Sequence, residues 1–183
     1  MKERIGNGPI SKAFKDRGIE TFGEACALVK SLVYKRCSSD LDILKVLHEN
    51  CGTCSSKHEL IKRLADENTI SNCQLILCVF KMSAANTRKV STILERYGME
   101  YIPEAHTYIL YNGELYDLTF PGETNLNYLK DVIFSQEIDA DHIREKADTH
   151  KSYLLKWIKE EKLKFSISEL WEIREQCILA LSE

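Results

Sequence analysis

An Asn112-Gly113 pair between two strand-like segments, residues 102–111 and 114–119, is the feature that most constrains how this chain folds. Asn-Gly favours a two-residue type I′ turn, because both central residues of that turn need a positive φ. Such a turn joins antiparallel strands and fixes their register. We therefore expect a β-hairpin at residues 102–119, with its turn at the Asn-Gly pair.

Capping residues and apolar spacing predict helices on both sides of the hairpin, and an apolar run at residues 73–81 predicts a buried strand. The sequence therefore indicates an α+β fold. We expect residues 1–124 to form the core and residues 125–183 a helical extension packed on it, in a single domain overall. Before the hairpin we expect four helices: one that begins at the capping box Thr21–Glu24, one that begins at Ser39 or Asp40, one from Cys54 to about Glu67, and one from Thr87 to Tyr97. After the hairpin we expect helical structure from Leu126 onward, with a long charged segment at 141–161, and a final helix that begins at the capping box Ser166–Glu169.

The composition predicts a soluble globular protein. The chain has 183 residues, of which 44% are hydrophobic and 29% charged, and its formal net charge is -3. That charge does not indicate a nucleic-acid partner. The longest apolar run is far shorter than the ~20 residues that span a bilayer, so we expect no membrane association. Because no secretory signal is visible, we expect the seven cysteines to be reduced and the protein to be cytoplasmic.

Cys54 occupies a position that favours a reactive thiol. Thr53 is a good N-cap, which makes Cys54 the first residue of the expected helix. The helix dipole and the unpaired backbone N–H groups at that end favour a thiolate. The N–H of Cys54 is also placed to donate to an oxyanion during acyl transfer, and His48 and Asn50 are candidates for the second donor.

The hairpin register brings an imidazole and a carboxylate to one face of the two strands. With Tyr111 opposite Glu114, His106 and Asp117 become diagonal neighbours, because side chains alternate between faces. The carboxylate can then accept the imidazole N–H and stabilise the imidazolium. The sequence predicts a triad of Cys54 as nucleophile, His106 as base and Asp117 as orienting acid.

Three motifs resemble the transglutaminase-like branch of the papain-like cysteine hydrolases: Gly52-Thr53-Cys54, His106-Thr107-Tyr108, and Asp117-Leu118-Thr119 followed by a proline. The resemblance implies a nucleophile helix packed on a small antiparallel sheet, and it assigns the same three triad residues. Residues 52–58, 102–106 and 170–178 are also similar to a group of uncharacterised microbial proteins.

The resemblance implies an enzyme that is a hydrolase, deamidase or acyltransferase. A thiolate attacks an amide or ester carbonyl, and water or an amine resolves the acyl-thioester. The substrate is then a peptide, a protein or a small-molecule amide or ester, and this chemistry needs no metal or organic cofactor. His58, Glu104 and Tyr108 are candidates for the substrate pocket, because His58 follows Cys54 by one helical turn and the others share the face of His106.

Two alternatives use the same residues differently. The first is a non-catalytic binding protein on the same fold. The second is a dithiol redox protein that uses Cys51 and Cys54, which form a C-x-x-C motif. A zinc site built from Cys51, Cys54, Cys73 and Cys78, with His58 as a spare ligand, is disfavoured, because an odd separation sends Cys73 and Cys78 to opposite faces of a strand.

Overall fold

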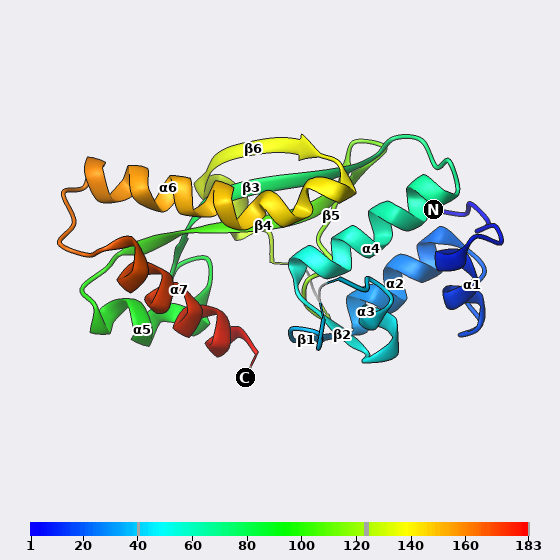
Figure 1. Ribbon diagram of the computed structural model, residues 1–183, viewed down its shortest axis with the longest axis horizontal. Helices are drawn as coiled ribbons and strands as arrows, with labels where there is room; N and C mark the ends of the chain where they lie inside the picture. The colour runs from blue at the N-terminus through cyan, green and yellow to red at the C-terminus, as the bar shows by residue number, and fades with distance from the viewer. Residues whose placement is uncertain (40, 123–124, 183) are drawn as a thin grey trace. The chain divides into compact units, whose positions relative to one another are not determined.

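The computed structural model describes residues 1–39, 41–122 and 125–182. The fold is α+β, as predicted, with helices and a small antiparallel sheet (Figure 1). The chain divides into two compact units, each assembled from three stretches of sequence. Unit 1 comprises residues 1–76, 107–124 and 137–143, and unit 2 comprises residues 77–106, 125–136 and 144–183.

Both units draw on sequence from either side of residue 124, and residue 124 itself lies outside the described residues. The division into a core and a helical extension stays a prediction.

The helices of unit 1 are α1 (Pro9–Lys15), α2 (Phe22–Ser31), α3 (Lys45–His48) and α4 (Cys54–Glu67). The helices of unit 2 are η1 (Arg88–Val90), α5 (Ser91–Arg96), η2 (Asn127–Asp131), α6 (Lys146–Glu160) and α7 (Ile167–Leu181). The short helix η3 (Ala140–Glu145) has residues in both units.

Two sheets are present in the described residues. In unit 1, β1 (Val33–Tyr34) and β2 (Cys51–Gly52) form a short parallel pair. The larger sheet has the strand order β5-β4-β3-β6. Its strands are β3 (Cys73–Ser83), β4 (Tyr101–Tyr111), β5 (Glu114–Tyr116) and β6 (Val132–Ile138).

The predicted hairpin is confirmed in its turn and register. Asn112 and Gly113 have φ values of 51° and 80°, as a type I′ turn requires. Tyr111 pairs with Glu114. The ladder contains only two further pairs, Leu110 with Leu115 and Ile109 with Tyr116, so the predicted opposition of residues beyond Tyr116 lies past the end of the ladder.

Several predicted helices are confirmed at their capped ends. α2 begins after Thr21, whose Oγ1 accepts the N–H of Glu24 at 3.3 Å. α7 begins after Ser166, whose Oγ accepts the N–H of Glu169 at 3.2 Å. These local signals are legible in sequence because donor and acceptor lie three residues apart.

The prediction of continuous helix from Leu126 onward is wrong at residues 132–138, which form β6. This strand pairs with β3 (73–83), which lies well before it in the chain. Local periodicity does not carry the signal for such a pairing, because its hydrogen bonds come from a distant segment.

The predicted helix starting at Ser39 or Asp40 is also wrong in extent, and Asp40 lies outside the described residues. α3 begins only at Lys45. The Oδ1 of Asp42 accepts the N–H of Leu44 at 3.0 Å, which favours a turn at this point. Leu41 is 74% exposed, so it does not contribute the apolar packing that a longer helix needs.

In unit 2, the core contains a buried ion pair. Arg174 on α7 donates from Nε and Nη2 to the two carboxylate oxygens of Glu104 on β4, at 2.8 and 2.6 Å. The ring of His150 lies 3.8 Å from the same carboxylate and hydrogen-bonds to the carbonyl of Pro103 at 2.7 Å. Burial raises the pKa of Glu104, but the Arg174 guanidinium and the His150 ring together lower it to about 2.

Among the residues that the structure describes, none of the helices combines the length and apolar character needed to cross a membrane.

We predict that Glu104→Gln weakens the acid dependence of stability. The folded pKa of about 2 lies below the ordinary value, so the carboxylate stabilises the fold above pH ~4.5 and loses this effect as pH falls toward 2. Urea unfolding from pH 5 to pH 2 should show a loss for the native protein that exceeds the variant's by about 3 kcal/mol. Glu172→Gln, at an exposed position of α7, is the control. Parallel pH curves for the native protein and Glu104→Gln would contradict this account.

Candidate functional site

Cys54 is the first residue of α4, as the sequence predicts, and it belongs to unit 1. The backbone of Thr53 precedes the helix in an extended conformation, and its N–H donates to the Oγ of Ser56 at 3.0 Å. The Sγ of Cys54 lies 3.9 Å from the Oγ of Ser55, and Cys54 is 7% exposed. The thiol therefore stands at the positive end of a 14-residue helix.

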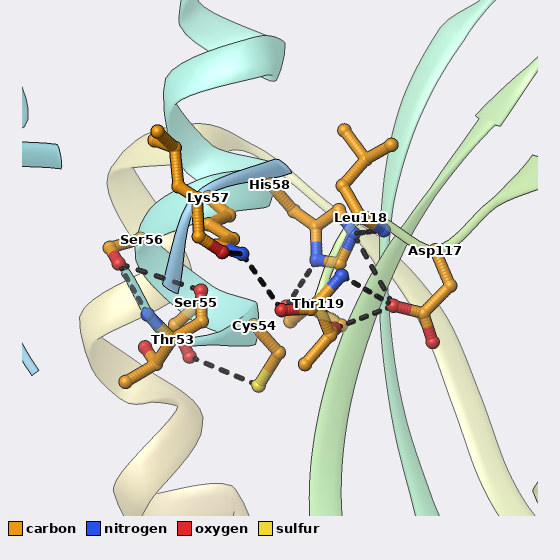
Figure 2. A network of polar contacts seen from close by, with 11 residues as sticks. Thr53, Cys54, Ser55, Ser56, Lys57, His58, Asp117, Leu118 and Thr119 are labelled. Atoms are coloured by element: carbon orange, nitrogen blue, oxygen red, sulfur yellow. Dashed lines mark hydrogen bonds and ion pairs between the residues drawn. The ribbon is translucent and has the colours of Figure 1, made fainter. Parts of the chain in front are cut away.

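Lys57, in the same first turn of α4, is completely buried. Its Nζ donates to the carbonyl of Leu32 at 2.6 Å and to the carbonyl of Thr119 at 2.8 Å. Figure 2 shows the second of these bonds, which ties the start of α4 to the segment after β5. The ammonium group is thus held by two backbone acceptors, away from water.

The charge of Lys57 acts on the groups around it. Burial lowers the pKa of Lys57 from 10.5 to about 8, although electrostatic attraction to Asp117, Cys51 and Cys54 opposes that shift. The amine remains mainly protonated at neutral pH. It therefore contributes a positive charge within electrostatic reach of the Cys54 thiol.

His58 is completely buried, and both its ring nitrogens take part in polar contacts (Figure 2). The backbone N–H of Leu118 donates to Nε2 at 2.8 Å, so Nε2 carries a lone pair and the neutral ring is protonated on Nδ1. Nδ1 lies 3.4 Å from the Oγ1 of Thr107 on β4. His58 thus holds the segment around Leu118 in place. Its predicted contact with substrate stays a prediction, and its burial does not support it.

Asp117 follows β5 and shapes a tight turn. Its Oδ1 accepts from the N–H of Thr119 at 3.0 Å and from the Oγ1 of Thr119 at 2.5 Å. The same oxygen lies 3.8 Å from the Nε2 of His58. Unit 1 therefore brings Asp117 together with His58 and, through electrostatics, with Lys57.

The other predicted site residues are divided between the two units. His106 belongs to unit 2, where its ring contacts Tyr128 edge-on at 5.0 Å and Phe80 at 6.3 Å. Glu104 is also in unit 2 and forms the buried ion pair with Arg174, in place of the exposed strand position that substrate contact would need. Tyr108 is in unit 1 and only 9% exposed.

Cys51 has a thiol neighbour that the sequence does not reveal. Its Sγ lies 4.0 Å from the Sγ of Cys37, and Cys37 Sγ approaches the carbonyl oxygen of Cys51 at 3.4 Å. The redox alternative had paired Cys51 with Cys54. The contact with Cys37 depends on the parallel pairing of β1 and β2, which local pattern does not signal.

Comparison with protein-family models, with curated proteins and with solved structures finds no match for this chain.

We predict that Lys57→Met changes how stability depends on pH. The unfolded amine has a pKa near 10.5 and the folded amine about 8, so between these values the unfolded chain binds more protons. Stability from this group therefore rises with pH across that window. The native protein should gain about 3 kcal/mol over Lys57→Met from pH 8 to pH 10.5, measured by urea unfolding.

The control for this experiment is Lys12→Met, at an exposed position of α1. Its stability should differ from that of the native protein by a constant amount across the same pH range. A constant difference for Lys57→Met as well would show that the buried ammonium does not titrate as described.

Proposed function

We propose that this protein catalyses thiol-dependent acyl transfer on an amide or ester carbonyl, with Cys54 as the nucleophile. The observation that carries the proposal is the position of Cys54 at the first residue of α4, with the Lys57 ammonium in the same helical turn. The helix end and the ammonium both favour the thiolate, which is the attacking species.

In this proposal the reaction follows the chemistry of the transglutaminase-like enzymes. The Cys54 thiolate attacks the carbonyl, and the leaving group departs with the proton that the His106 imidazolium donates. Water or an amine, deprotonated by His106, then resolves the acyl-thioester. His106 is the base and Asp117 the orienting carboxylate, as the sequence motifs indicate. The backbone N–H of Cys54 donates to the developing oxyanion. The mixed α+β fold, with α4 ahead of β4 and β5 in the chain, is compatible with that family.

The two alternatives make different demands on the same residues. A binding protein on this fold needs no reactive thiol. A dithiol enzyme that uses Cys51 and Cys54 needs both cysteines, whereas the thiol contact described for Cys51 is with Cys37, at 4.0 Å. The acyl-transfer proposal needs Cys54 alone among the cysteines.

The test is the burst of p-nitrophenolate released when the protein is mixed with p-nitrophenyl acetate, a generic acyl donor. We expect a burst from the native protein and none from Cys54→Ala, because the acyl group has no sulfur to accept it. Acetyl transfer should map to Cys54 by mass spectrometry. Cys73→Ala, which removes another buried thiol of unit 1, is the matched control and should retain the burst.

Asp117→Asn provides a second variant that preserves local structure, because an amide oxygen can accept the same two hydrogen bonds from Thr119. We expect the burst rate to fall by about 100-fold or more, as when an orienting carboxylate is lost from a triad. His106→Ala should have at least as large an effect. Unchanged burst rates in both variants, or an undiminished burst in Cys54→Ala, would contradict the proposed triad.

A further inference from the structure

Three potential metal ligands converge in unit 1, outside the residues used by the proposed acyl transfer. They are the Sγ of Cys37, the Sγ of Cys51 and a carboxylate oxygen of Glu49, and all three atoms lie within 4.8 Å of one another. Cys51 lies on β2, Glu49 follows α3 and Cys37 follows β1. Two stretches of sequence, residue 37 and residues 49–51, therefore meet at one point.

The separation of the two sulfurs fits shared coordination to zinc. Tetrahedral zinc with Zn–S bonds of about 2.3 Å places two thiolate sulfurs about 3.8 Å apart. The observed distance between Cys37 Sγ and Cys51 Sγ is 4.0 Å.

The third ligand is already oriented. Ser38 donates to Glu49 from its backbone N–H at 2.9 Å and also from its hydroxyl. These bonds hold the carboxylate in one orientation. Carboxylates that bind metals are held by hydrogen bonds of this kind. The side chain of Glu49 is 29% exposed, which leaves a route for the ion from solvent.

The charge of the Lys57 ammonium group offsets the net charge of the proposed site. Two thiolates and one carboxylate around a divalent ion leave one net negative charge, and the Lys57 ammonium group interacts electrostatically with Cys51. A metal ion that binds here displaces the protons of the two thiols.

We propose that Cys37, Glu49 and Cys51 bind a zinc ion, with water in the fourth position. A set of two sulfurs and one oxygen suits the borderline-soft character of Zn²⁺. This ligand set differs from the one considered from the sequence, which combined Cys51 with Cys54, Cys73 and Cys78. The ion would join the end of β1 to β2, directly ahead of the Thr53 cap of α4. The inference does not rest on the proposed acyl transfer.

The test is titration of the reduced, metal-free full chain with Co²⁺, which reports tetrahedral thiolate ligation by its absorption. We expect one Co²⁺ per chain, with a thiolate-to-cobalt charge-transfer band and intense visible bands, all abolished when Zn²⁺ is added. Cys37→Ser should lose the charge-transfer intensity of one sulfur and bind at least about 10-fold more weakly. Glu49→Gln, an exposed change that leaves both sulfurs, should weaken binding by a similar factor.

The controls separate this site from the other cysteines. Cys73→Ala and Cys54→Ala should keep the native spectrum and affinity, because neither sulfur belongs to the three-residue group. An intact spectrum in Cys54→Ala with loss of its acyl-transfer burst would keep the two proposals independent. The zinc proposal is overturned if the reduced protein gives no thiolate–cobalt band, or if Cys37→Ser binds Co²⁺ as the native protein does.

Discussion

The two hydrogen bonds of the buried Lys57 ammonium group are the interaction on which the arrangement around the start of α4 depends. The ammonium group binds the carbonyl at the end of α2 and the carbonyl of Thr119, and so fixes both against the first turn of α4. A buried charge is tolerated only where such acceptors replace water. Gly52 is part of the same constraint, because a Cβ there would lie 2.8 Å from the Cγ of Lys57 and 3.0 Å from the Oγ of Ser56. The glycine ahead of Thr53 and Cys54 is therefore explained by close packing.

The same residues set the electrostatics around Cys54. A helix N-terminus supplies partial positive charge from its free N–H groups, and Lys57 adds a full charge that water does not screen. His58 contributes differently: it is a neutral ring that accepts the N–H of Leu118 and keeps the turn at Asp117 in position. His58, which lies close to Cys54 in the sequence, therefore positions the segment around Leu118.

Local signals account for what the sequence predicted well. The start of α4 follows from Thr53, and the hairpin turn follows from Asn112 and Gly113, because each signal is complete within a few residues. The burial of Lys57 could not be predicted, since both of its acceptors are distant in the chain. Strand β6 could not be predicted either, because it forms by pairing with the distant strand β3. The approach of Cys37 to Cys51 could not be predicted because it requires the pairing of β1 with β2. Glu104 looked exposed on its strand because its partner, Arg174, lies seventy residues away.

The most direct test of the central claim, that Cys54 is the activated thiol, is its alkylation rate by iodoacetamide across pH, resolved for each cysteine by mass spectrometry. The account predicts that Cys54 reacts first, and that its rate reaches half of its limit below the pH of about 8.5 expected for an ordinary cysteine. Cys37, whose pKa is raised to about 12, should react far more slowly at neutral pH. If Cys54 is alkylated no faster than Cys37 at neutral pH, the helix end and the Lys57 ammonium do not activate it, and the account fails.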